Sequence, residues 1–267
     1  MWNEEIGEWI RALLSHEPDH LGYRALSWSI PLLKHHLSRW AGEEMSEHTI
    51  RRHLHEMGFA WKRPRYVLSP DPDRARKMRD IRKKVAHLDE RSVLLFQDET
   101  DLLLFPPLRS AWAERGMAAQ VPISGWNEKR VVFAAINVCT GHLLSLARPK
   151  NRAQDFQFFL RHLQWHYRGW HIVIVLDSGP SHTARSTEIV ARALGIDLIF
   201  LPYRAPELNP IETLWGKAKD IVCANRQYED IEDQADQFIA YLLDLSLNEA
   251  LQKTGLLHPE RFWLWKN

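Results

Sequence analysis

The hydrophobic positions follow two patterns, which divide the chain into a helical first part and a second part rich in strands. In the first 60 residues, apolar side chains recur at the three-to-four spacing of a helix and predict helices near residues 2–14, 29–40 and 47–57. Ser46 suits the N-cap of the third helix, and Gly58 suits its end. From residue 91, short apolar runs predict strands at residues 93–97, 110–115, 130–138, 142–147, 172–176 and 197–201.

Helical segments separate and follow the later strands. We expect helices over residues 155–167, 183–194, 210–224 and 230–251. An opening set of strands followed by alternating strands and helices predicts an α/β fold with a mixed five-stranded sheet flanked by helices. This is the pattern of an RNase H-like core. We therefore expect three parts: a DNA-binding region at 1–70, a basic helical linker at 71–90, and a catalytic domain at 91–267.

The second and third helices have the order and length of a helix-turn-helix, and a short basic and aromatic stretch follows as a candidate wing. The residues that we expect to contact DNA are Thr49, Arg51 and Arg52 on the third helix, and Lys62, Arg63 and Arg65 in the wing. A small helical subdomain without DNA contacts is the alternative explanation of the same pattern.

Composition excludes several classes of protein. The 267 residues are 45% hydrophobic and 26% charged, which is ordinary for a globular protein with a substantial core. No apolar run approaches the roughly 20 residues of a membrane helix, and the acidic start of the chain argues against a secretory signal. Two distant cysteines fit neither a disulfide framework nor a zinc knuckle and favour the reducing cytoplasm.

Charge is unevenly distributed although the net charge is only +1. Residues 48–88 hold 12 Lys/Arg against 4 Asp/Glu, whereas residues 1–47 hold 4 against 8. A concentrated basic segment is expected where a protein meets a polyanion. A solvated basic helix would give the same count, so the charge alone does not decide between the two.

Three acidic residues follow or open predicted elements in a way that suits metal binding. Asp98 ends the apolar run 93–97, Asp177 ends the run 172–176, and Glu212 lies in the first turn of a helix that begins after Asn209 and Pro210. Carboxylates at the rim of a sheet can hold hard divalent cations. Each acid also has a simpler explanation: a surface carboxylate after a strand, or a favourable charge at a helix N-terminus.

Neighbouring residues complete the candidate site. Because side chains alternate along a strand, Asp98 and Glu99 should face opposite ways, and we assign Asp98 to the site. His182 and Asn209 are expected to support the carboxylates rather than to bind metal directly, although His182 could also serve only as a helix cap. Lys217 and Lys219 would lie near a phosphate backbone if Glu212 holds a metal on it.

At this point the chain resembles a known family. The segments FQDET at 96–100, LDSGPSH at 176–182 and LPYRAPELNPIETLW at 201–215 resemble the motifs of DDE transposases of the mariner-related bacterial insertion sequences. The 34 residues between Asp177 and Glu212 match the spacing of that family, and residues 46–68 resemble its winged-helix region. The resemblance implies that Asp98, Asp177 and Glu212 bind two Mg²⁺ or Mn²⁺ ions.

The resemblance also implies an activity. It predicts hydrolysis of phosphodiesters at transposon ends, 3′-OH strand transfer into double-stranded target DNA at TA, a homo-oligomeric synaptic complex, and work at the bacterial nucleoid in the cytoplasm. Members of the family usually begin with a further helix-turn-helix module, so we expect the DNA-binding region of this chain to be partial. A catalytically inactive DNA-binding derivative acting as a repressor and an RNA–DNA hybrid nuclease are the alternatives.

Overall fold

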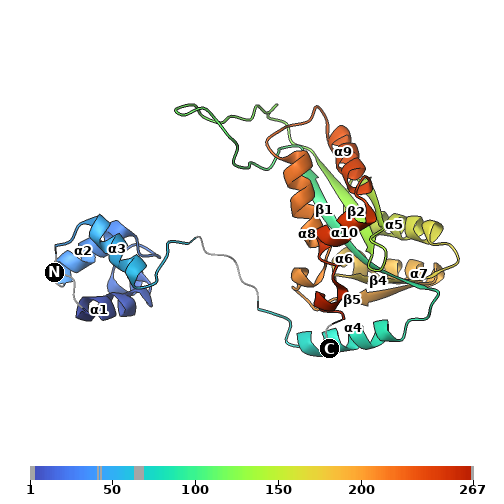
Figure 1. The fold of residues 1–267 in the computed structure, drawn as a ribbon, viewed down its shortest axis with the longest axis horizontal. Coiled ribbons are helices and arrows are strands. Elements are labelled where there is room, and N and C mark those ends of the chain that lie inside the picture. The colour runs from blue at the N-terminus through green and yellow to red at the C-terminus, as the bar shows by residue number, and fades with distance from the viewer. Residues whose placement is uncertain (1–3, 41, 43, 63–68, 266–267) are drawn as a thin grey trace. The chain divides into compact units, whose positions relative to one another are not determined.

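The structure is a computed structural model that describes residues 4–40, 42, 44–62 and 69–265. The chain forms two compact units, Met1–Val67 and Leu68–Asn267 (Figure 1). The boundary falls close to the expected end of the DNA-binding region at residue 70. Each unit is taken on its own below.

The first unit is built from helices, as its hydrophobic spacing predicts. It contains α1 (Glu4–Leu14), a short 3₁₀ helix (Pro18–Leu21), α2 (Ile30–Trp40) and α3 (Glu47–Glu56). Ser46 caps α3, because its side chain accepts a hydrogen bond from the backbone N–H of Thr49. The buried faces of the helices meet in one apolar core that includes Ile10, Leu37 and Ile50.

The second unit contains the expected mixed five-stranded sheet. Its strands are β1 (Ser92–Leu103), β2 (Lys129–Asn137), β3 (Leu143–Arg148), β4 (His171–Leu176) and β5 (Ile196–Phe200), in the order β3-β2-β1-β4-β5. The pairs β1–β2 and β2–β3 are antiparallel, whereas β4 pairs parallel to both β1 and β5. The carboxyl ends of β1, β3, β4 and β5 therefore point toward the same edge of the sheet.

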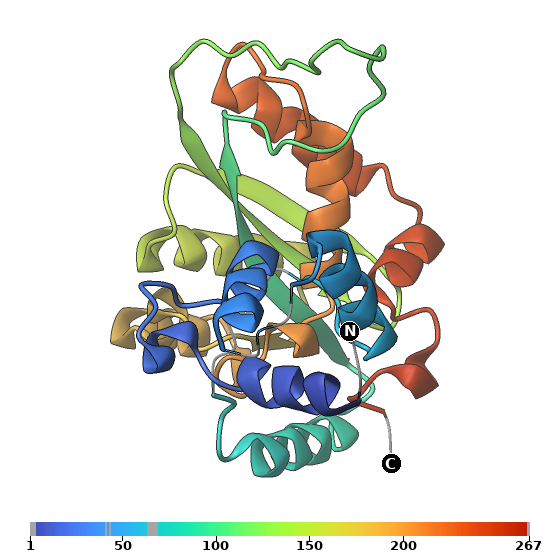
Figure 2. The same ribbon diagram turned by 90° about the vertical axis from the view of Figure 1, so that its left-hand side faces the viewer.

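Helices cover both faces of this sheet, as Figures 1 and 2 show for α5 and α8. The helices α5 (Ala153–His166) and α7 (Arg185–Ala193) pack on the face that carries Val93 and Leu95. The helices α8 (Glu212–Ala218), α9 (Ile231–Leu243) and α10 (Leu247–Thr254) pack on the face that carries Leu94 and Phe96. Alternate residues of β1 thus supply two separate cores, which explains its continuous apolar run.

The basic helix that we expected as a linker, α4 (Arg74–Ala86), is part of the second unit. Ile81 and Val85 on its inner side are buried in the core of that unit, and its basic residues lie on the outside. A linker helix would have had no buried face. The helical spacing of these two apolar residues was present in the sequence, but the many basic residues around them favoured the interpretation as a linker.

Four predicted elements differ from the structure. The strand expected at 110–115 is wrong: the residues have no strand partner and are exposed throughout, within the long β1–β2 connection. The helix expected at 183–194 is instead α6 (Pro180–Thr183) followed by α7. The helix expected at 210–224 begins at Glu212 and ends in a π-helical turn, Lys219–Cys223. The helix expected at 230–251 is two helices, because Ser246 and Glu249 form a capping box that starts α10.

None of the described helices has both the length and the apolar character needed to cross a membrane.

Candidate active site

Asp98 lies within β1 rather than at its end, because the strand continues to Leu103. The alternation predicted for this strand holds: Asp98 turns toward α8 and Glu99 toward α6. The indole N–H of Trp215 in α8 donates to Asp98 Oδ2 at 2.9 Å. Burial, and then the negative charge of Glu212, raise the pKa of Asp98 to about 8 despite this hydrogen bond.

Asp177 follows the last residue of β4, at the carboxyl edge of the sheet. Its Oδ1 accepts hydrogen bonds from the backbone N–H of Gly179 at 2.9 Å and from His182 Nδ1 at 2.6 Å. Its side chain is 62% exposed, so the carboxylate faces solvent while one oxygen is held. The hydrogen bond from His182 lowers the pKa of Asp177, which keeps this acid ionised.

His182 joins Asp177 to a second acid that the sequence analysis did not assign to the site. Its Nε2 lies 2.7 Å from Glu99 Oε1, and the His182 and Glu99 side chains are only 2% and 8% exposed. Burial alone would lower the pKa of His182, but its hydrogen bonds to Asp177 and Glu99 raise that pKa to about 10. The imidazole is therefore a cation that donates from both nitrogens, and it holds one oxygen of Asp177.

Glu212 begins α8, after a turn that is fastened to other parts of the second unit. Asn209, which we expected to support the site, donates from Nδ2 to the backbone carbonyl of Gln97 at 2.8 Å, directly before Asp98. Trp263 Nε1 donates to the carbonyl of Leu208 at 2.8 Å. These two hydrogen bonds hold the turn before α8, one against β1 and the other against the last part of the chain.

The first residues of the same turn are held from α4. Asp71 accepts hydrogen bonds from Lys77 Nζ at 2.7 Å and from the backbone N–H of Tyr203 at 2.9 Å. The hydrogen bond from Lys77, followed by those from the backbone, lowers the pKa of Asp71 to about 2. Arg74 forms an ion pair with Glu207 in the turn. The position of α8 therefore depends on the docking of α4.

The charges of the three predicted acids act on one another. Burial raises the pKa of Glu212, and the charge of Asp177 raises it further. Glu212 in turn is the main charge that raises the pKa of Asp98. Lys219, the residue directly after α8, is half-buried; burial lowers its pKa, while Glu212 and Asp98 are among the acids that oppose this shift. The fold thus brings Asp98, Asp177 and Glu212 into one electrostatic neighbourhood.

Such a cluster fits hard divalent cations. Carboxylate oxygens are the ligands that Mg²⁺ and Mn²⁺ prefer, and a cation would relieve the repulsion that raises the pKa of Asp98. The ligand oxygens of the three acids do not all lie within 4.8 Å of one another; within the described residues, that spacing is met only by the exposed group Glu17, Asp19 and His20 in the first unit.

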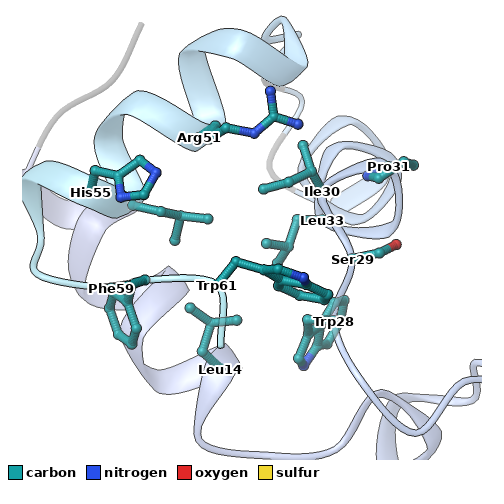
Figure 3. Close-up of a pocket in the computed structure, with 12 residues that line it drawn as sticks. Leu14, Trp28, Ser29, Ile30, Pro31, Leu33, Arg51, His55, Phe59 and Trp61 are labelled. Atoms are coloured by element: carbon teal, nitrogen blue, oxygen red, sulfur yellow. The ribbon is translucent and has the colours of Figure 1, made fainter. Parts of the chain in front are cut away.

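The residues predicted to contact DNA occupy different environments in the first unit. Arg51 lines an apolar cavity of about 410 Å³ between α2 and α3, together with Ile30 and Trp61 (Figure 3). Thr49 Oγ1 lies 2.9 Å from Ser46 Oγ in the cap of α3. Arg52 is exposed, as is Lys62. Arg63 and Arg65 lie outside the described residues.

The two predicted lysines beyond Glu212 also differ. Lys217 is exposed, and its Nζ donates to the backbone carbonyl of Lys253 at 3.1 Å, at the end of α10. Lys219 is half-buried, and its charge interacts with those of Asp101, Glu212 and Asp98. Lys219 is therefore the better placed of the two to meet a phosphate group held at the acids.

Two family models match this chain. Residues 93–234 match the family model of the DDE superfamily endonuclease, and residues 25–75 match a winged helix-turn-helix model. The chain is 28% identical over 227 residues to the insertion element IS630 uncharacterized 39 kDa protein of Shigella sonnei, covering 84% of this chain and 66% of that protein. The chain thus spans just under two thirds of that relative.

Solved structures show the same fold. Crystal structures of the mariner Mos1 paired-end complex with Mg and with Mn match with TM-scores of 0.62 and 0.61, at 16% and 15% identity. Each match covers 88% of this chain and 77% of that protein. The family model spans more than half of the chain and includes all three acids. The chain belongs to the DDE superfamily of endonucleases.

Proposed function

We propose that this chain is the transposase of an insertion sequence, which cuts phosphodiesters at the ends of the element and joins the freed 3′-OH to target DNA. The observation that carries the proposal is the shared electrostatic field of Asp98, Asp177 and Glu212, which come from three separate segments. A buried carboxyl with a pKa of about 8 beside other acids suits a site that is completed by cations.

The three acids would hold two Mg²⁺ or Mn²⁺ ions, which supply an activated water or 3′-OH and stabilise the leaving oxygen. The protein residues orient this set. His182 and the N–H of Gly179 fix one oxygen of Asp177, and Trp215 fixes one oxygen of Asp98. Lys219 offers a positive charge beside Glu212 for the phosphate that is being cut.

Binding of the DNA is assigned to both units. Thr49, Arg51, Arg52, Lys62, Arg63 and Arg65 would contact the transposon end, and Lys217 and Lys219 the strand at the active site. The Mos1 structures are described as paired-end complexes. For this chain we likewise propose a homo-oligomer that holds double-stranded transposon ends and target DNA at the nucleoid, in the cytoplasm.

The test is cleavage by Asp177→Asn of a duplex that carries the inverted repeats flanking the gene, with Mg²⁺ or Mn²⁺. We expect strand cleavage to be lost while binding of the same duplex, measured by gel shift, stays within about twofold. Asp197→Asn, which alters an exposed acid on β5, is the matched control and should cleave as the wild type does. Mg²⁺-dependent cleavage by Asp177→Asn would contradict the assignment of the site.

The same assay separates the alternative functions. A repressor that has lost catalysis would shift the duplex without cutting it, in the wild type as well as in the variant. A nuclease for RNA–DNA hybrids would cut a hybrid of matching sequence in preference to the duplex. Metal binding itself can be followed by titration calorimetry, in which Asp177→Asn should bind Mn²⁺ more weakly than Asp197→Asn does.

A further inference from the structure

The outer face of α5 carries a stripe of aromatic and basic side chains that the proposed active site does not use. Exposed residues recur along the helix at helical spacing: Gln154, Phe158, Arg161 and Trp165, with Arg168 continuing the series in the turn that follows. Phe158 and Trp165 are 48% and 71% exposed. The opposite side of α5 is buried against the sheet, so core packing does not account for these two exposed rings.

The stripe is positively charged. Residues 148–170 contain five Lys/Arg and one acid, Asp155, which is buried and paired with Arg148 at 3.0 Å. The guanidinium of Arg148 also lies 4.5 Å from the centre of the Phe158 ring. The neighbouring elements α6, α7 and β3, which are fully described, add one acid between them, Glu188, and it is ion-paired with Arg192. The face therefore complements a polyanion.

The stripe begins beside the candidate active site. Since β3 runs parallel to β1 and β4, Arg148 at its carboxyl end lies on the same edge of the sheet as Asp177. On the buried side of α5, the Phe156 ring lies 4.4 Å from the His182 ring. From this edge α5 runs along the outside of the sheet (Figure 1). A strand leaving the site in this direction would pass over the exposed rings.

We infer that this α5 stripe binds a single strand of DNA, with bases stacked on Phe158 and Trp165 and phosphates paired with Arg161 and Arg168. Exposed aromatic rings between cations are the usual design of single-strand binding surfaces, whereas the bases of a duplex already stack on one another. The two rings are seven residues apart, about 10 Å along a helix, which is about three nucleotides of a stacked strand. The inference rests on the proposed function for the presence of DNA and adds a second surface to it.

The experiment measures the anisotropy of a labelled 20-nucleotide oligothymidylate bound to the full chain in EDTA, with excess unlabelled duplex to occupy other DNA surfaces. The Phe158→Ala/Trp165→Ala variant should bind the oligonucleotide at least tenfold more weakly. Trp165→Phe should keep most of the affinity, because phenylalanine can still stack. Arg161→Glu should weaken binding and flatten its dependence on salt.

Trp126→Ala is the matched control, because Trp126 lies on the β1–β2 connection and is as exposed as Trp165, at 71%. It should bind the oligonucleotide as the wild type does. Equal binding by the double variant, an equal loss in Trp126→Ala, or failure of the wild type to bind the oligonucleotide would each overturn the inference. Because the binding assay contains EDTA and no metal, it measures binding separately from cleavage. The α5 stripe and the proposed transposase activity can therefore each fail while the other stands.

Discussion

The two contacts of His182 should have separable effects on stability and on catalysis. One contact joins it to Glu99, whose side chain is 8% exposed, and the other to Asp177, whose side chain is 62% exposed. Breaking a buried ion pair leaves an uncompensated charge and costs about 3–5 kcal/mol. Breaking an exposed pair costs about 0–1 kcal/mol. The Glu99 contact should therefore stabilise the fold, and the Asp177 contact should orient the carboxylate.

On this reasoning His182→Ala, which strands the buried Glu99 carboxylate, lowers the unfolding free energy of the second unit by about 3 kcal/mol or more. Glu99→Gln, which leaves the buried imidazolium facing a neutral amide, lowers it by about 1–3 kcal/mol. Asp177→Asn lowers it by about 1 kcal/mol or less and still abolishes cleavage. The order of the three variants in stability should thus differ from their order in activity.

The assay is urea-dependent hydrogen exchange, read by mass spectrometry on peptides from β1 and β4. These strands are central in the sheet, so their exchange reports opening of the second unit as a whole. Cleavage of end-containing duplex is measured on the same preparations. A loss of stability in Asp177→Asn as large as that in His182→Ala, or a stable His182→Ala protein, would refute the division between the two contacts.

Three further predictions concern the site and its support. Trp215→Phe removes the hydrogen bond that lowers the pKa of Asp98, so that pKa should rise further. The pH profile of cleavage at fixed Mg²⁺ should move to higher pH, and an unchanged profile would count against a role for the bond. Asp71→Asn should loosen α4: because the pKa of Asp71 is about 2 instead of 3.8, its carboxylate stabilises the fold above about pH 4, and this contribution disappears as the pH falls toward 2. Urea unfolding at pH 6 and pH 2.5 should therefore show a smaller difference between wild type and variant at pH 2.5 than at pH 6. Gly179→Ala would place a methyl group 3.1 Å from Asp177 Oδ1, and the backbone φ of −56° accepts an alanine without strain. Cleavage should therefore fall severalfold while the thermal midpoint changes little. A normal cleavage rate would show that the site tolerates the added methyl group.

The hydrophobic pattern was sufficient for the sheet of the second unit because its central strands, β2, β4 and the first half of β1, are buried on both faces. Continuous apolar runs such as 172–176 can be recognised without knowledge of the partner strands. The exposed segment 110–115 was wrongly predicted as a strand because Trp112 has strand propensity, whereas its neighbours do not and the segment has no partner strand. Propensity without a burial pattern is weak support for a strand.

Within the site, the sequence indicated the acids but not their connections. Strand alternation correctly placed Asp98 and Glu99 on opposite faces of β1. It could not show that Glu99 contacts His182, because no feature of the neighbouring sequence brings these two residues together. The contacts of Asn209 with Gln97 and of Trp215 with Asp98 join residues more than 100 positions apart. Such contacts depend on how the layers pack, and periodicity along the chain carries no information about them.

The contact between Trp263 and the carbonyl of Leu208 has a consequence for the order in which the protein is made. A ribosome synthesises all five strands and the three acids before it reaches Trp263. Until that residue emerges, the turn that leads into α8 lacks one of its fastenings, and Glu212 is not fully held. The turn before α8 therefore gains its full set of contacts only after the chain has been synthesised as far as Trp263, well after the three acids themselves.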